Sequence, residues 1–187
     1  MRPVPVFQDL PETEELPTAP SYATRSRATA PAACALIETP AGPLLVYGTI
    51  IAHFGDRGPL GQSKYNTEQQ AAILAHAHDW RRLHAQYPGV PLIVAGDFNA
   101  TCDHRNQPTV TTCTMLRAAI RDAGLACVIA HLTIDHICVS TESADSVTVE
   151  APWQQSYDPG RGTGRKPVSD HHGVSIHLHL LPRIAQR

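Results

Sequence analysis

One short apolar run, residues 92–95, constrains this chain more than any other stretch because it leads directly into a group of polar residues. The run contains two β-branched residues, as expected for a strand buried on both faces of a sheet. Gly96 then allows the backbone to turn tightly or to approach another segment closely. Asp97 and Asn99 come next, and their side chains point the same way if the chain stays extended. This pattern predicts an oxygen-rich pair at the edge of an α/β sheet, where ligands commonly bind.

Two later stretches repeat the arrangement in reverse order, with an Asp-His pair at the head of an apolar run. The pairs are Asp135-His136 and Asp170-His171. If both later runs are antiparallel to the first in one mixed sheet, all three acidic corners meet at one edge. A turn cap remains the alternative explanation for the first acidic corner taken alone, since Asp and Asn both cap turns well.

Three motifs in this order resemble the later motifs of the endonuclease/exonuclease/phosphatase superfamily. They are Gly96-Asp97-Phe98-Asn99, Ile134-Asp135-His136-Ile137 and Ser169-Asp170-His171. Its members include abasic-site endonucleases, DNase I-like nucleases, sphingomyelinases and inositol-phosphate phosphatases. The likeness covers roughly residues 33–180, and the three motifs together are much more specific than any one of them. The resemblance implies an α/β (α+β) fold, a DNase I-like sandwich with a mixed, mostly antiparallel sheet and flanking helices.

The resemblance also implies a role for each residue of the site. Asp97 would position and activate the attacking water and bind metal, and Asn99 would hold the phosphate. His171 would contact the scissile phosphate, with its other nitrogen oriented by Asp135. Asp170 would be a metal ligand.

Two further histidines are candidates for this site. His53 would contact the phosphate, because many family members place a histidine or aromatic residue just beyond the corresponding strand. The commoner position for that histidine, directly after Thr49, holds Ile50 instead, and an ordinary loop histidine is the alternative. His172 is a candidate metal ligand, but it occupies a position that is variable in the family.

The clustered carboxylates predict a metal cofactor. Carboxylates that converge on one edge repel each other unless a positive charge lies between them, and hard oxygen ligands favour Mg²⁺ or Mn²⁺ over zinc. Such an ion polarises a phosphate ester and stabilises the leaving oxygen. A histidine beside an aspartate adds a group that titrates near neutral pH. A zinc site built from His136, His171 and His172 is the weaker alternative, since no helical H-x-x-x-H spacing supports it.

The residues predict a charged cluster ready to bind metal, and the resemblance implies a divalent-metal-dependent phosphoester hydrolase in which water attacks phosphorus in line. A nuclease or other phosphodiesterase and a phosphatase are not separated by the sequence, so the substrate is a nucleic acid, a lipid or a sugar phosphate. The net charge of −2 gives no sign of a nucleic-acid surface. The rival hypothesis is a catalytically inactive homologue that serves as a binding or interaction module.

The composition predicts an ordinary globular domain. The chain has 187 residues, 42% of them hydrophobic, which is enough for one domain with a real core. Five cysteines without a C-x-x-C pair suggest neither a disulfide framework nor a cysteine zinc site. No apolar run approaches the roughly 18 residues needed to span a bilayer, and the first residues lack a secretory signal. We therefore expect a cytoplasmic protein without a membrane span.

The sequence predicts one folded domain between an irregular N-terminal segment and a short tail. Residues 1–32 are rich in Pro, Ala, Thr and Glu and are expected to be irregular and mobile. Residues 33–182 would form the domain, and 183–187 a tail. In the family, the first half of the fold supplies an Asn and a metal-binding Glu, each after an apolar strand, and no such strands precede residue 33. The resemblance thus implies that this half is missing, that metal binding and activity are weakened, and that an uncovered apolar sheet face supports a homodimer.

Local patterns predict the individual elements. Residues 33–39 and 44–51 read as a hairpin, and residues 66–86 as a helix with a capping box formed by Asn66 and Gln69. A second helix is expected to begin at Thr112 and to end at Gly124. Later strands are expected at residues 125–130, 134–140, 146–150 and 174–180.

Overall fold

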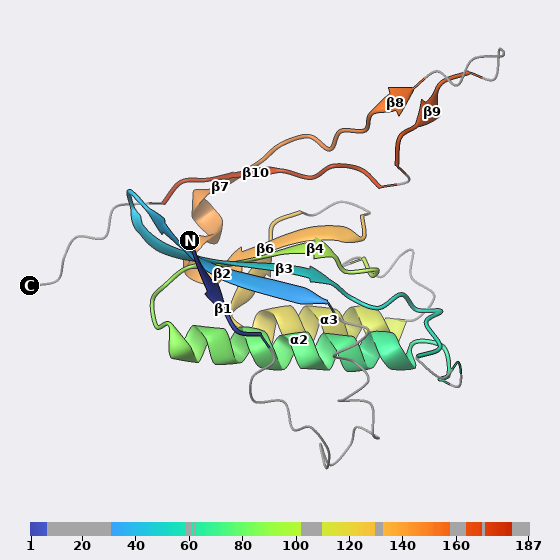
Figure 1. Ribbon diagram of the computed structural model, residues 1–187, viewed down its shortest axis with the longest axis horizontal. Helices are drawn as coiled ribbons and strands as arrows, with labels where there is room; N and C mark the ends of the chain where they lie inside the picture. Colours follow the sequence, from blue (N-terminus) through green and yellow to red (C-terminus); the bar gives the residue numbers. More distant parts are fainter. Residues whose placement is uncertain are drawn as a thin grey trace, which may run out of the picture.

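A six-stranded sheet forms the central layer of the computed structural model (Figure 1). The structure describes these parts of the chain: residues 1–6, 31–58, 61, 63–101, 110–129, 133–157, 164–169 and 171–180. In sheet order the strands are β1 (Arg2–Val4), β2 (Ala32–Thr39), β3 (Gly42–Ile50), β4 (Leu92–Asp97), β6 (Asp135–Ser140) and β5 (Leu125–Cys127). Within this sheet β3 and β4 are parallel, and the other neighbours are antiparallel. The sheet is therefore mixed and mostly antiparallel, as the sequence predicted.

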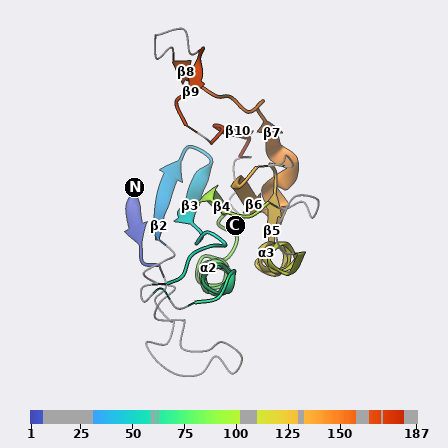
Figure 2. The same ribbon diagram turned by 90° about the vertical axis from the view of Figure 1, so that its right-hand side faces the viewer.

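Two helices cover one face of this sheet. They are α2 (Thr67–Gln86), which connects the parallel strands β3 and β4, and α3 (Val110–Asp122) (Figures 1 and 2). Trp80 and Leu83 of α2 are fully buried in one core with Tyr47 of β3 and Leu92 of β4. Each large side chain buried in this way contributes about 1.5–3 kcal/mol. This packing fixes the direction in which β4 delivers its polar end.

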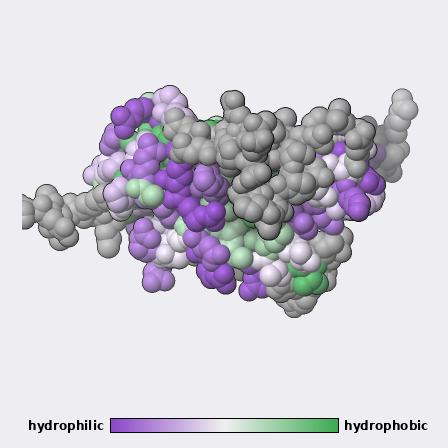
Figure 3. Space-filling model, turned by 90° about the horizontal axis from the view of Figure 1, so that it is seen from below, coloured by the Kyte–Doolittle hydropathy of each residue, from purple (hydrophilic) through white to green (hydrophobic). Residues whose placement is uncertain are grey.

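The outer surface of the helical layer is mostly hydrophilic. Figure 3, seen from below, shows purple side chains interrupted by smaller apolar areas among the described residues. Neither α2 nor α3 is long and apolar enough to cross a membrane, and the same holds for every helix in the described part of the chain.

The opposite face of the sheet is apolar and only half-buried. In β4 the alternation is visible, with Leu92 and Val94 buried against the helices and Ile93 and Ala95 half-exposed on the other side. The expectation that this strand is buried on both faces is therefore met on one face only. Among the described residues, no layer covers the second face as completely as the helices cover the first.

A second, smaller layer lies on that side. It consists of β7 (Val147–Val149) and β10 (Ile176–Leu178), paired antiparallel after the short 3-10 helix η2 (Thr141–Ser146) (Figures 1 and 2). The hairpin of β8 (Ser156–Tyr157) and β9 (Lys166–Pro167) extends beyond it. The expectation of one sheet containing all three acidic corners is wrong for the third, because its strand pairs with β7.

Several element boundaries differ from the sequence prediction. Arg2–Val4 form an edge strand on β2, within the segment that was expected to be irregular. The helix predicted from Thr112 begins two residues earlier, so Thr112 is buried inside α3, and Gly124 follows the helix with φ 68°. Asn66 stands before α2 in the left-handed region, φ 64°, without a side-chain capping bond. The predicted capping box is thus wrong, and its second member is free for another contact.

A close approach of two strands makes Gly96 necessary. Its φ is 148°, and a Cβ built there would lie 1.8 Å from the carbonyl oxygen of Thr49. Gly48 in the neighbouring strand is a useful contrast, since a Cβ there would lie 4.0 Å from its nearest neighbour, the carbonyl oxygen of Ala33. The side of β4 next to the acidic end therefore accepts only glycine.

We predict that Gly96→Ala lowers the free energy of unfolding by about 3 kcal/mol or more, because the backbone of β3 must move aside. Gly48→Ala should change it by less than about 1 kcal/mol, since open space receives its methyl group. Urea unfolding followed by circular dichroism measures both. Equal effects of the two substitutions would contradict the close approach.

A buried histidine joins α2 to β3. His76 is fully buried, its Nδ1 lies 3.0 Å from the hydroxyl of Tyr47, and its Nε2 lies 2.9 Å from the hydroxyl of Thr49. Its ring stacks on Trp80 with centroids 6.0 Å apart. Burial lowers the pKa of His76 from 6.5 to about 3, although a backbone hydrogen bond to Ile50 acts in the opposite direction. The imidazole is therefore neutral in the folded protein at neutral pH.

We predict that His76 makes stability depend on pH in acid. Between about pH 6.5 and 3 the unfolded chain binds a proton at His76 and the folded chain does not, so the free energy of unfolding falls as the pH is lowered. Urea titrations at a series of pH values should show a shallower fall for His76→Gln. His179→Gln, at an exposed histidine, is the control. An unchanged slope in His76→Gln would contradict a neutral buried imidazole.

Candidate active site

The site begins where β4 ends, at Asp97. The sheet register pairs Asp97 with Asp135 at the start of the antiparallel strand β6, so two carboxylates meet at one edge. The backbone is fixed on both sides, because Ile51 N–H donates to the Asp97 carbonyl at 2.8 Å and Phe98 N–H donates to the Ile134 carbonyl at 2.7 Å. Phe98 itself is fully buried, which anchors the chain between the two polar residues.

Asn99 folds back onto Asp97. Its φ is 48°, its backbone N–H donates to Asp97 Oδ1 at 2.8 Å, and its side-chain Nδ2 donates to Asp97 Oδ2 at 3.1 Å. The same Nδ2 donates to the Ile51 carbonyl at 2.8 Å. The chain is therefore not extended here, and the turn-capping interpretation describes this corner. Both Asp97 oxygens are held in defined directions while the carboxylate remains half-exposed.

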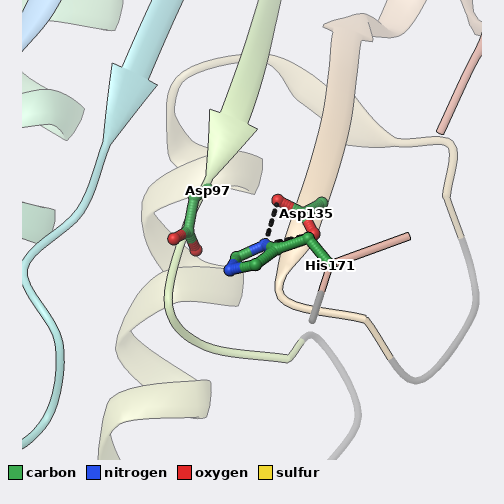
Figure 4. Close-up of side chains that lie close together, drawn as sticks. All are labelled: Asp97, Asp135 and His171. Atoms are coloured by element: carbon green, nitrogen blue, oxygen red, sulfur yellow. Dashed lines mark hydrogen bonds and ion pairs between the residues drawn. The ribbon is translucent and has the colours of Figure 1, made fainter. Parts of the chain in front are cut away.

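The second half of the site is a hydrogen-bonded pair formed by Asp135 and His171. Nδ1 of His171 lies 3.1 Å from Oδ1 and 2.9 Å from Oδ2 of Asp135. Figure 4 shows the imidazole between the two aspartates, with its second nitrogen on the side of Asp97. The Asp135 backbone is fixed in turn by a hydrogen bond from its N–H to the Thr133 hydroxyl, 3.0 Å. An imidazole oriented by a carboxylate in this way is prepared to exchange or hold a proton at its other nitrogen.

Three side chains thus form one cluster. Ligand atoms of Asp97, Asp135 and His171 lie within 4.8 Å of one another, and all three residues are half-buried. The two carboxylates are donors that suit Mg²⁺ or Mn²⁺, whereas an imidazole is more often a ligand of transition metals such as zinc, copper or iron. The two carboxylates therefore fit the metal that the sequence predicted, and the imidazole is engaged by Asp135.

The other residues predicted for the site are not part of this cluster in the described structure. Asp170, the predicted metal ligand, lies outside the described residues. His53 is exposed, its Nδ1 accepts a hydrogen bond from the Gly55 N–H at 3.1 Å, and its ring packs on Phe54 with centroids 4.0 Å apart. It does not belong to the cluster formed by the described residues. His172 is exposed beside His171 and also stands outside this cluster.

His136 supports the site from behind. It is fully buried, its Nε2 lies 2.9 Å from the Ala100 carbonyl, and its Nδ1 lies 3.4 Å from Cys127 Sγ. Burial by itself lowers the pKa of His136, but Cys127, the Ala100 carbonyl and the charge of Asp135 raise it overall. Both nitrogens face inward partners, so His136 braces the turn and is not available as a zinc ligand.

Sequence reasoning missed one contact of the site. The buried side chain of Gln69, expected to cap α2, donates from Nε2 to the Asn99 carbonyl at 2.7 Å. Its position on the buried stripe of the helix, four residues before Ile73, is the only signal in the sequence. A polar side chain on such a stripe needs a buried partner, but the partner is set by the tertiary fold.

Comparison with solved structures identifies the class of fold. The chain is similar to the mannosyl-6-phosphatase of Bacteroides thetaiotaomicron, with a TM-score of 0.51 and 16% identity over 80% of this chain and 56% of that one. It is also similar to beta toxin from Staphylococcus aureus (TM-score 0.49, 12% identity, 79% and 57%). A third match is an endonuclease/exonuclease/phosphatase from Beutenbergia cavernae (TM-score 0.44, 17% identity, 78% and 38%). No family model and no curated protein matches the sequence.

The chain therefore shares part of its fold with this mannosyl-6-phosphatase. The mixed, mostly antiparallel sheet with flanking helices that the sequence predicted is confirmed. The chain spans about half the length of the solved structures that it resembles. Identities this low show shared architecture alone.

Proposed function

We propose that this chain is a divalent-metal-dependent phosphoester hydrolase, and that water attacks phosphorus in line at the cluster of Asp97, Asp135 and His171. The observation that carries the proposal is the placement of an oriented imidazole between two carboxylates at the edge of the sheet. The same three motifs that carry the family resemblance supply these groups. Members of that superfamily act on phosphate esters, which supports the reaction class.

Each residue of the cluster has a separate proposed role in the reaction. Asp135 holds Nδ1 of His171, so the second nitrogen is directed toward Asp97, and there it would donate a hydrogen bond to a phosphate oxygen. Asp97, held by Asn99, would accept a proton from the attacking water. The Asn99 amide nitrogen already donates to Ile51 and Asp97. A hydrogen bond from Asn99 to a phosphate oxygen would therefore need a rearranged amide, because the side-chain oxygen only accepts.

A bound Mg²⁺ or Mn²⁺ would neutralise charge on the phosphate and on the leaving oxygen. Asp97 and Asp135 are the described residues that would hold it, and Asp170 is proposed as a further ligand on the family resemblance alone. His53 keeps its proposed role as a phosphate contact on the same ground. The proposed substrate class is a phosphate ester. The shared part of the fold, about half of the related structure, is common to nucleases, lipid phosphodiesterases and phosphatases and does not distinguish among them.

We predict Mg²⁺-dependent hydrolysis of an aryl phosphodiester, an aryl phosphomonoester or plasmid DNA, abolished by chelator. His171→Ala and Asp97→Asn should each lower kcat by about 100-fold or more, because both groups act on the reacting atoms. His179→Ala, at an exposed histidine in the segment after His171, is the matched control and should retain full activity.

A folded sample that shows no turnover above His171→Ala on any of the three substrates would overturn the hydrolase proposal. The rival, an inactive homologue that acts as a binding module, would then be favoured. It is supported by the fact that the described residues bring together only two carboxylates and one imidazole.

The half-buried face of the sheet supports a second proposal, a homodimer. Outward-facing apolar residues of β2, β3 and β4 include Ile37, Val46 and Ile93, which are only partly covered although β7 and β10 lie on that side. Contiguous apolar surface of this kind commonly marks an interface. A second copy of the chain would bury it without exposing charge.

We predict that size-exclusion chromatography with light scattering gives twice the monomer mass of 20.2 kDa at micromolar concentration. Val46→Glu should shift the protein toward monomer, because it places a charge in the apolar face. Leu74→Glu, at an exposed apolar position on the outer face of α2, is the control and should leave the mass unchanged. A monodisperse monomer in the unmodified protein would rule the dimer out.

A further inference from the structure

We infer that Gln69 is a positioning residue of the site. It acts through the turn after β4 and fixes the direction of the Asp97 carboxylate without touching substrate or metal. The effect of Gln69 on catalysis rests on the proposed function. Its effect on the conformation of the turn can be tested without any enzymatic activity.

The turn between Asp97 and Asn99 is held by a small number of specific bonds. Asn99 sits at φ 48°, a left-handed conformation that asparagine tolerates better than other residues with a side chain but that is still uncommon. Its N–H and Nδ2 point at the two Asp97 oxygens, and both bonds depend on this conformation. Whatever stabilises Asn99 in this state therefore also sets the direction of both Asp97 oxygens.

Gln69 supplies the stabilising contact from a different element. Its Nε2 donates to the Asn99 carbonyl at 2.7 Å, across 30 residues of sequence, and the residue is 1% exposed. A short, buried hydrogen bond of this kind resists rotation of the Asn99 peptide group. Such a rotation would leave the buried Asn99 carbonyl without this partner, at a cost of about 1–3 kcal/mol.

The orientation of the Gln69 amide is set by its partner on the turn. Because the Asn99 partner is a carbonyl, the amide must present its nitrogen there, and its Oε1 is left buried without a hydrogen-bond partner among the described residues. A residue chosen only for stability would be apolar at this position of the buried stripe. A glutamine that carries an unpaired acceptor in order to donate to Asn99 is explained by a requirement of the site.

The neighbouring Gln70 offers a matched control. It has the same side chain on the same turn of α2, but its Nε2 faces the Thr112 hydroxyl of α3 at 3.4 Å instead of the turn after β4. The comparison of Gln69→Met with Gln70→Met therefore removes one amide in each case, at nearly constant volume, from a fully buried site at Gln69 and from a half-buried site at Gln70.

The first readout is hydrogen exchange of the Asn99 backbone amide, measured by NMR on the metal-free chain. This amide donates to Asp97 Oδ1 and reports the turn directly. Gln69→Met should raise its exchange rate about 10-fold, which corresponds to about 1.4 kcal/mol and lies within the cost of a lost buried partner. Gln70→Met should leave it unchanged. Exchange at Asn99 that is the same in Gln69→Met as in the unmodified protein would overturn the inference. Gln69→Ala is the second variant if the methionine does not fit.

The second readout is Mn²⁺ affinity by calorimetry, followed by kcat and KM. Removal of residues that orient ligands typically weakens metal affinity by about 10–100-fold, so Gln69→Met should raise the Kd for Mn²⁺ at least about 10-fold and lower kcat more than it raises KM. The melting temperature should fall further in Gln69→Met than in Gln70→Met, because only the first substitution leaves the Asn99 carbonyl without this buried partner. Unchanged Mn²⁺ affinity in Gln69→Met, with altered Asn99 exchange, would overturn the link from the turn to the metal.

The two proposals fail in different ways. An unmodified protein that binds no Mn²⁺ and hydrolyses no phosphate ester would overturn the proposed function, while faster Asn99 exchange in Gln69→Met would still support the positioning of the turn. A protein that binds Mn²⁺ and turns over substrate equally well with Gln69→Met would overturn the inference and leave the proposed function standing.

Discussion

The antiparallel pairing of β4 with β6 is the constraint on which the site depends. It places Asp97 directly opposite Asp135, the last pair in the register. Two carboxylates side by side repel each other, and hydrogen bonds and an imidazole from the surrounding groups offset that repulsion. Asn99 donates to both oxygens of Asp97, and His171 faces both oxygens of Asp135. A shift of the register by one residue would separate the pair, because it would turn one carboxylate toward the helices.

The site is assembled from three layers of the molecule. The sheet supplies the two carboxylates, α2 supplies the amide of Gln69 that braces the turn, and the chain leading to β10 supplies His171 from the other side of the sheet. The buried face of the sheet is rigid because Trp80 and Phe98 pack there, with ring centroids 6.2 Å apart. The opposite face is half-buried, so the carboxylates lie between the buried core and the less covered side of the sheet.

The sequence predicted the elements that carry a strong local signal. The hairpin of β2 and β3, the long helix α2 and the strand that ends at Asp97 are confirmed because hydrophobic period and turn residues agree there. The capping box of Asn66 and Gln69 failed, since a buried tertiary partner outcompeted the local one. The strand after His171 was placed in the wrong sheet, because an alternating pattern shows that one face is buried but not which strand lies beside it.

By itself, the sequence determined the types of group at the site and their order along the chain, because each acidic corner adjoins an apolar run. It also determined the mixed, mostly antiparallel class of the sheet through the resemblance of its motifs. The resemblance also implied that Asp135 orients His171, and a turn cap at Asp97 and Asn99 was one of the two explanations that the sequence left open for that corner. Only the tertiary structure decided between those two explanations, brought His171 to Asp135 from a separate layer, and showed that Gln69 reaches the turn. Gln69 lies 30 residues from Asn99 and carries no local signal for its partner, so only the packing of α2 on the sheet could bring the two together.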